Sequence, residues 1–346
     1  MPAFDLSGLG WTSELAEQLE PGLAPGRVAA AHRGAFDVWT ADEAVRCSVP
    51  GKFIHDGVDV AVGDWVGVTD GMIRAVLPRR SAIVRNAAGL TTTAQTLAAN
   101  VDTAFVVSSL GPDLEPRRLE RYLVSIWETG ASPEIVLTKA DRLEDPWELV
   151  AEVEAVAPGV PVHVVSAVSG QGVDALRARI QPGTTAVLLG SSGVGKSTLV
   201  NRWLGEELMA TSETRVDDDE GRHTTTHRQL LVLPGGGLVI DSPGIRELQL
   251  WDVGTAGLDA TFSDVEELAA DCRFADCSHE HEPGCAVLGA VESGALAPDR
   301  LHSWRKLQRE LRAIAIRHDV LLRKQEGRKW HLATREGKAR ADAKRR

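Results

Sequence analysis

A glycine-rich run in the middle of the chain has the residue types and spacing of a phosphate-binding loop, reading Gly190-Ser191-Ser192-Gly193-Val194-Gly195-Lys196-Ser197-Thr198. Glycines let successive backbone N–H groups turn toward phosphate oxygens, and the N-terminus of the following helix adds positive potential. Lys196 would bridge the outer phosphates and Ser197 would reach a magnesium ion. The context fits, because an apolar strand pattern ends at Leu189 and a helical pattern follows. The loop alone predicts a nucleoside triphosphate site.

Two short motifs indicate which base is bound. Thr138-Lys139-Ala140-Asp141 resembles the guanine-recognition motif N-K-x-D. Its aspartate accepts hydrogen bonds from N1 and the exocyclic amine of guanine, a donor pair that adenine lacks. Thr138 departs from this pattern, since it offers a hydroxyl where asparagine offers an amide. Ser166-Ala167 resembles the S-A motif, whose backbone N–H meets the guanine O6. Together the two motifs favour GTP.

Further residues suit magnesium binding and hydrolysis. Asp241-Ser242-Pro243-Gly244 fits D-x-x-G, in which Asp241 holds magnesium through water and the Gly244 N–H senses the γ-phosphate. Within Thr224-Thr225-Thr226 we favour Thr225 as the second magnesium ligand. Ile245 stands where a Ras-like enzyme places its water-positioning glutamine, and an aliphatic side chain cannot orient water.

Another group must therefore assist hydrolysis alongside Lys196. We expect it to be His223, which precedes the threonines and belongs to the side-chain type that titrates near neutral pH. A solvent-exposed histidine without a catalytic role is the alternative interpretation.

The order of the motifs is unusual. In ordinary GTPases the phosphate loop comes first and guanine recognition last, whereas here Asp141 and Ser166 precede Lys196 and Asp241 follows. The sequence therefore predicts a circular permutation of the domain. Such a permutation would join the magnesium-sensing segment directly to the C-terminal region, so that the nucleotide state could be transmitted there.

A cysteine cluster follows the nucleotide motifs, with Cys272, Cys277, His279 and Cys285 falling within fourteen residues. Three thiolates and one imidazole make a closed tetrahedral set suited to structural zinc, without an open position for catalysis. His281 could replace His279 on spacing alone. Cys47 stands apart and is interpreted as a small buried apolar residue.

The elements that must position these residues fall into three regions. Residues 25–86 carry short apolar stretches separated by turns, which predict a small β-barrel of OB or SH3-like type, with strands at 27–31, 36–39, 58–62, 65–69 and 72–76. From residue 101, buried strands at 103–107, 134–137, 162–165, 185–189 and 238–240 alternate with helical patterns at 116–129, 146–156, 173–180 and 197–204. This alternation predicts a doubly wound, mostly parallel sheet. A long amphipathic helix pattern follows the cysteines.

Composition limits the partners and the compartment. No apolar run is long enough for a membrane span and no secretory segment is visible, so we expect a cytoplasmic protein that does not bind membranes. The net charge of −11 argues against a surface coated with nucleic-acid-binding charge. Residues 317–346 nevertheless hold eleven Lys/Arg against four Asp/Glu. That tail suits a polyanion, or is simply a solvated terminus.

These residues together resemble the circularly permuted, ribosome small-subunit-dependent GTPase family of bacteria (RsgA-like). The resemblance covers nearly the whole chain and includes Pro78-Arg79-Arg80-Ser81, Ala98-Ala99-Asn100-Val101-Asp102, Gly190 to Thr198, Gly221 to Thr226, Asp241 to Gly244 and the Cys272, Cys277, His279, Cys285 set. It implies an α/β P-loop GTPase domain, circularly permuted, preceded by an all-β OB-fold barrel and followed by a helical zinc-binding domain.

The expected boundaries are an N-terminal region with the OB-fold at 1–86, a connector at 87–100, the GTPase domain at 101–255 and the zinc domain with the basic tail at 256–346. The resemblance implies GTP hydrolysis with magnesium, one structural zinc ion, and stimulation by the small ribosomal subunit and its 16S rRNA during late maturation of that subunit. We expect a monomer. Two other functions stay open: a P-loop ATPase or kinase, and a nucleotide-dependent RNA-binding module with negligible hydrolysis.

Overall fold

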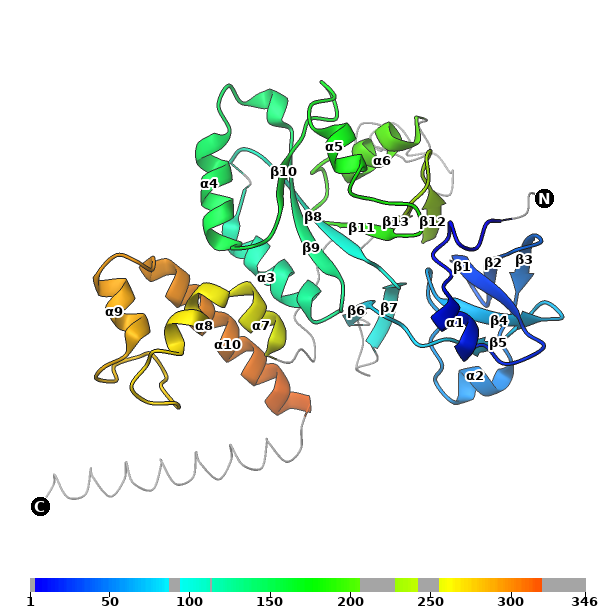
Figure 1. Cartoon of the computed structure of the whole chain (residues 1–346), viewed down its shortest axis with the longest axis horizontal. Helices are drawn as coiled ribbons and strands as arrows, with labels where there is room; N and C mark the ends of the chain where they lie inside the picture. The colour runs from blue at the N-terminus through cyan, green and yellow to red at the C-terminus, as the bar shows by residue number, and fades with distance from the viewer. Residues whose placement is uncertain (1–3, 87–93, 113, 206–227, 242–254, 319–346) are drawn as a thin grey trace, which may run out of the picture. The chain divides into compact units, whose positions relative to one another are not determined.

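The computed structural model describes residues 4–86, 94–112, 114–205, 228–241 and 255–318 (Figure 1). The chain divides into two compact units, residues 1–249 and 250–346. The first unit contains a small barrel and a larger mixed sheet, and the second is helical. Within the described residues, no helix is both long and apolar enough to cross a membrane.

The barrel is built from five short strands, β1 (Ala24–His32), β2 (Ala35–Thr40), β3 (Ala44–Cys47), β4 (Trp65–Thr69) and β5 (Met72–Val76). Strand β1 pairs with both β2 and β4, β2 pairs with β3, and β4 pairs with β5, all antiparallel. A parallel bridge between Ser48 and Met72 closes the circle from the end of β3 to β5. This closed order of strands 1-2-3-5-4 is that of an OB-fold, which the strand pattern alone could not distinguish from an SH3-like barrel.

The strand expected at residues 58–62 is wrong. These residues form irregular chain leading into β4, and the missing strand is Ala44–Cys47. The short helix α2 (Gly51–His55) lies between them, and a second short helix, α1 (Ser13–Gln18), precedes the barrel. Cys47 is 1% exposed, as expected of a small buried residue.

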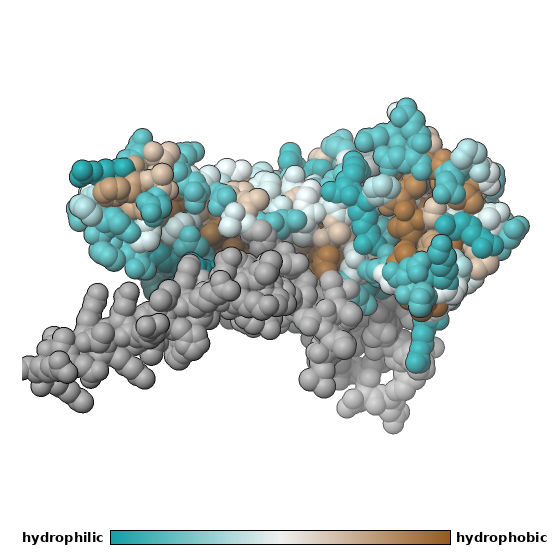
Figure 2. All heavy atoms as spheres, turned by 90° about the horizontal axis from the view of Figure 1, so that it is seen from below, coloured by the Kyte–Doolittle hydropathy of each residue, from teal (hydrophilic) through white to brown (hydrophobic). Residues whose placement is uncertain are grey.

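The surface of the barrel mixes hydrophobic and hydrophilic atoms on the side where α2 lies (Figure 2). Ile54 and Val58 expose apolar side chains in this region. Trp39 and Trp65 are occupied internally, since Trp39 stacks on Phe4 with ring centroids 4.8 Å apart and Trp65 is 1% exposed. Both tryptophans therefore contribute to the packing of the barrel.

Part of the connector expected at 87–100 forms a strand. Strand β7 (Ala94–Ala99) pairs antiparallel with β6 (Ala82–Asn86), so that its second half belongs to a two-stranded ribbon. An Ala- and Thr-rich sequence has little strand periodicity, and pairing with β6 decides its conformation.

The central sheet has the order β10 (Val162–Val164), β9 (Ser132–Thr138), β8 (Thr103–Ser109), β11 (Thr185–Leu189), β13 (Leu238–Asp241) and β12 (Gln229–Val232). The first five strands are parallel to their neighbours, and β12 is antiparallel to β13. Strand β12 was not expected from the sequence. It continues the sheet to β1 of the barrel, so that one sheet runs through both parts of the first unit.

Helices cover both faces of this sheet, as the alternating pattern predicted (Figure 1). In β8, Ala104 and Val106 pack with α3 (Pro116–Trp127) and α4 (Trp147–Val156), while Phe105 and Val107 pack with α5 (Val173–Arg177) and α6 (Lys196–Leu204). Burial on both faces is what makes these strands almost uniformly apolar.

The second unit contains four described helices, α7 (Ala256–Thr261), α8 (Ser263–Ala269), α9 (Ala286–Glu292) and α10 (Pro298–His318). The apolar stripe of α10 is buried at Leu301, Trp304, Leu307 and Leu311, as its three- and four-residue spacing predicts. The cysteine cluster lies in the loop between α8 and α9.

Candidate nucleotide and metal sites

The nucleotide motifs meet at one edge of the central sheet. The phosphate loop follows β11, the T-K-A-D motif begins at the end of β9, Ser166 lies two residues beyond β10, and β13 ends at Asp241. These four strands are parallel, so their carboxyl ends share an edge. Ligands of open α/β sheets bind outside this edge.

The phosphate loop has the backbone that a phosphate cradle needs. Gly190, Gly193 and Gly195 have φ values of +144°, +78° and +99°. A Cβ atom on Gly190 would lie 2.1 Å from the carbonyl oxygen of Val107, so only glycine fits there. Lys196 Nζ donates hydrogen bonds of 2.7 Å to the carbonyls of Gly190 and Ser191, which keeps its ammonium group over the loop.

The two base-recognition motifs are joined by a direct contact. Ser166 Oγ donates a 2.5 Å hydrogen bond to Asp141 Oδ1, and Ser166 itself is fully buried. Asp141 is exposed, which leaves its second carboxylate oxygen open to a ligand. Lys139 adopts a left-handed conformation (φ 61°) that carries the chain away from the end of β9 toward Asp141.

The Thr138 hydroxyl, which replaces the amide of the N-K-x-D pattern, lies close to two backbone carbonyls. It lies 2.5 Å from the carbonyl oxygen of Val194 and 3.2 Å from that of Ser108. A single hydroxyl proton can serve one carbonyl at a time. The threonine therefore ties the guanine loop to the phosphate loop, and this position needs a donor, which a hydroxyl supplies.

Several predicted site residues lie outside the described residues. They are His223, Thr225 and Gly244, together with Ile245, and the side chain of Asp241 is likewise not described. The backbone of Asp241 is placed, opposite Gln229 of β12. The assignments of magnesium ligands and of the catalytic histidine thus stay predictions.

A cavity beside the phosphate loop is lined in part by Arg118, a residue that no sequence motif indicated. It has a volume of about 410 Å³ and is bounded by the end of β8, the start of α3, Lys139 and the phosphate loop. Arg118 Nη1 donates a 3.2 Å hydrogen bond to Ser191 Oγ, and Arg118 also pairs with Glu115 at 2.5 Å. Arg118 supports the loop from outside. An arginine near a helix start is too common a signal to have revealed this contact.

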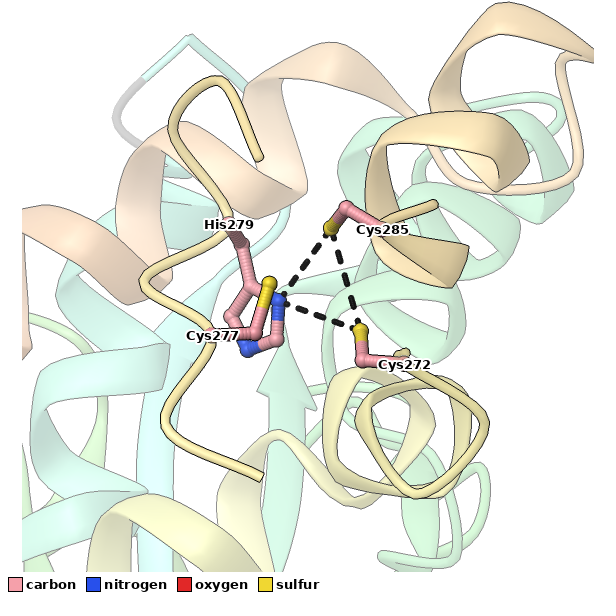
Figure 3. A group of neighbouring side chains, drawn as sticks. All are labelled: Cys272, Cys277, His279 and Cys285. Carbon is pink, nitrogen blue, oxygen red and sulfur yellow. Dashed lines mark hydrogen bonds between the residues drawn. The ribbon is translucent and has the colours of Figure 1, made fainter. Parts of the chain in front are cut away.

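The predicted zinc ligands come together as a compact group (Figure 3). The sulfur atoms of Cys272, Cys277 and Cys285 and a nitrogen of His279 all lie within 4.8 Å of one another. Cys272 Sγ is 3.8 Å from Cys285 Sγ, and His279 Nδ1 is 3.4 Å from Cys285 Sγ. Tetrahedral zinc with Zn–S bonds of about 2.3 Å requires ligand separations of about 3.8 Å. His279, and not His281, is the histidine that lies among the three cysteines.

The surroundings of these ligands suit a cation. Burial raises the pKa of Cys272, but hydrogen bonds from the N–H groups of Val287 and Ala286 at the start of α9 help to lower it by a larger amount. The net shift of this pKa is therefore downward. Burial and the neighbouring thiols raise the pKa of Cys277 to about 11. One thiolate is thus favoured and a second is opposed, as expected of crowded thiols. A divalent cation would stabilise all three as thiolates.

The fold and site define a class of protein, a P-loop nucleotide-binding protein whose guanine-recognition motifs precede its phosphate loop. Two solved structures are similar to this fold. The crystal structure of YjeQ from Thermotoga maritima superposes with a TM-score of 0.65 and 29% identity, covering 83% of this chain and 98% of that one. The circularly permuted GTPase YloQ superposes with a TM-score of 0.62 and 26% identity, covering 85% of this chain and 96% of that one.

The chain belongs to the RsgA GTPase family, whose model matches residues 76–251. A protein of Streptomyces coelicolor described as small ribosomal subunit biogenesis GTPase RsgA is 48% identical over 98% of this chain and 96% of its own length. A protein of the same description from Methanosarcina acetivorans is 43% identical over 93% of this chain and 89% of its own. The resemblance, the permuted fold and the GTPase class expected from the sequence are confirmed.

Proposed function

We propose that this protein hydrolyses GTP and that the small ribosomal subunit stimulates it during late maturation of that subunit in the cytoplasm. The observation that carries the base specificity is the contact of Ser166 with Asp141 at the edge where the phosphate loop lies. A carboxylate fixed from one side and open on the other suits the two N–H donors of guanine. The descriptions of the relatives support the ribosomal partner.

We assign magnesium to Ser197, Thr225 and Asp241, and when bound it would neutralise charge on the β- and γ-phosphates. Lys196 holds its ammonium group over the phosphate loop, and Arg118 supports that loop through Ser191. Since Ile245 cannot orient water, we assign that task to His223. Loss of at least tenfold in turnover for His223→Ala, with GTP affinity retained, is the expected result.

Structural zinc fits the Cys272, Cys277, His279 and Cys285 group, because the donor set is closed and the ligand spacing matches a tetrahedron. In the same proposal the OB-fold barrel contacts 16S rRNA through its exposed surface. The basic tail contacts this RNA through attraction between its Lys and Arg side chains and the phosphates. The protein then acts as a monomer on the ribosomal particle.

Turnover of GTP and of ATP, each with and without purified small subunits, tests this function. We expect GTP to be preferred by at least a hundredfold and its hydrolysis to rise at least tenfold with subunits. A preference for ATP would indicate a P-loop ATPase or kinase. Negligible hydrolysis under both conditions would indicate a nucleotide-dependent RNA-binding module, the function that Ile245 favours.

A further inference from the structure

The barrel and the GTPase sheet share one buried arginine. Arg27 lies in β1 and is 1% exposed. Its guanidinium donates to Thr185 Oγ1 at 2.7 Å, to the carbonyls of Asn100 at 3.3 Å and Gly63 at 3.4 Å, and to the carbonyl of Leu9. These acceptors belong to four parts of the chain. Thr185 lies in β11, the strand before the phosphate loop, Asn100 at the entry to the GTPase domain, Gly63 in the barrel and Leu9 in the N-terminal arm (residues 4–18).

The N-terminal arm fills the junction around this arginine. The Gly183 N–H donates a 3.1 Å hydrogen bond to the carbonyl of Gly8, and Trp11 packs on Trp65 with ring centroids 4.9 Å apart. Gly10 has φ +92°, and a Cβ atom there would lie 2.5 Å from the Gly183 carbonyl oxygen and 3.4 Å from Arg27 Nη1. The arm, the barrel and the GTPase sheet also contribute to a single hydrophobic core cluster.

Strand pairing connects this junction to β13, which ends at the predicted magnesium ligand Asp241. One edge of β1 pairs with β4 as far as Arg27. Beyond an irregularity near Ala29, the same edge pairs with β12, and Ala30 lies opposite Gln229. Gln229 in turn lies opposite Asp241 in β13. One residue thus separates the barrel from the predicted magnesium aspartate. Arg228, three residues after the predicted magnesium ligand Thr225, donates a 3.4 Å hydrogen bond to the Thr96 carbonyl of β7.

We propose that Arg27 is a positioning residue and that, with the N-terminal arm, it makes the barrel a rigid continuation of the GTPase sheet. Contacts made by the barrel on RNA then act on the phosphate strand through Thr185 and on the magnesium end through β1 and β12. This proposal rests on the proposed function and assigns the route by which the ribosomal partner stimulates hydrolysis. The route is separate from the connection to the C-terminal region that the permutation predicts.

Two matched pairs of variants test it. Gly10→Ala places a methyl group against Gly183 and Arg27, whereas Gly22→Ala has a nearly equal φ of +90° and meets no atom within 4 Å. Thr185→Val removes the hydroxyl that accepts from Arg27, and Thr185→Ser retains it. If Gly10→Ala fails to fold, the pair at Thr185 decides, since valine and threonine have similar shapes.

The readout is GTP turnover at saturating concentrations of small subunits, beside kcat and KM for GTP without them. We expect Gly10→Ala and Thr185→Val to lose at least fivefold of the maximal stimulation, while unstimulated kcat and KM stay within twofold of wild type. Gly22→Ala and Thr185→Ser should behave as wild type. Maximal stimulation that persists in the folded variants, or a change only in the subunit concentration required, would overturn the proposal.

Amide hydrogen exchange separates this inference from the proposed function. Adding a non-hydrolysable GTP analogue in place of GDP should change exchange in β12 and in β1 of the wild type, and Gly10→Ala should keep the change in β12 alone. If wild-type protein shows no stimulation by subunits, the proposed function fails and the exchange result decides the inference. An unchanged exchange of β1 in the wild type would refute it.

Discussion

At the scale of single residues, the nucleotide site depends on side chains that fix one another. Ser166 holds Asp141, and Thr138 reaches the phosphate loop at Val194. Each contact joins residues that are distant in sequence, and each places a loop where a rigid strand ends. The first hydrogen bond therefore joins the two base-recognition motifs, and the second couples base recognition to phosphate binding.

The first prediction concerns the base. Asp141→Asn exchanges an acceptor for a donor, so guanine recognition should weaken while xanthine, which carries a carbonyl in place of the exocyclic amine, should be accepted. We expect the ratio of GTP to XTP affinity to fall by at least a hundredfold, measured by competition with a fluorescent nucleotide. An unchanged ratio would show that Asp141 does not contact the base.

The second prediction concerns the tether between the loops. Thr138→Val removes the hydroxyl but keeps the shape, which should cost about 1 kcal/mol and weaken GTP binding about fivefold. Thr138→Ser, which keeps the hydroxyl, should bind GTP within twofold of wild type. Equilibrium titration measures both, and equal affinities of the valine and serine variants would contradict the assignment.

At the scale of elements, a buried carboxylate links the edge of the central sheet to its covering segment. Glu134 of β9 lies 2.7 Å from His163 Nε2 of β10 and accepts a 2.7 Å hydrogen bond from Arg179, beyond α5. Burial raises the pKa of Glu134, but the hydrogen bonds from His163 and Arg179 outweigh it and the net shift is downward. Deprotonated Glu134 therefore stabilises the fold.

The third prediction follows from the sign of that shift. A carboxyl group whose folded pKa is depressed contributes its full stability above its unfolded pKa of about 4.3, and loses it as the pH falls through the folded value. Glu134→Gln should cost about 1–2 kcal/mol of unfolding free energy at pH 7. Urea unfolding should show this difference shrinking below about pH 4.3. The exposed Glu154→Gln is the control, and a difference that grew in acid would contradict the prediction.

At the scale of the whole molecule, the chain has two compact units. The barrel and the central sheet of the first unit share one sheet and one hydrophobic cluster, whereas the Cys272, Cys277, His279 and Cys285 group lies entirely in the second unit. The helices α7 to α9 are only six or seven residues long, so metal ligation in the loop between α8 and α9 should contribute to the stability of the second unit.

The fourth prediction uses removal of the metal. We expect about one zinc ion per chain by elemental analysis, and we expect chelation to lower the melting temperature of the second unit by at least 10 °C in calorimetry. Cys285→Ser should reproduce the loss without chelator. GTP affinity should stay within twofold, because the nucleotide site lies in the first unit. A melting profile insensitive to chelation would exclude a structural metal.

The sequence by itself determined the local chemistry and the class of protein. Motifs such as Gly190 to Ser197 and the Cys272 to Cys285 cluster carry their function in residue type and spacing, and buried strands such as Thr185–Leu189 show as apolar runs. Their order along the chain was enough to indicate the permutation, since order is a property of sequence alone.

Only the tertiary structure decided how distant segments meet. The closure of the barrel through Ser48 and Met72, the strand at 94–99 and the junction at Arg27 all depend on partners far away in sequence. A residue type near a turn gives no sign of such a partner, because pairing energy is realised only when both segments are in place. For the same reason the sequence shows Thr138 only as a departure from the N-K-x-D pattern, whereas the structure shows its hydrogen bond to the phosphate loop at Val194.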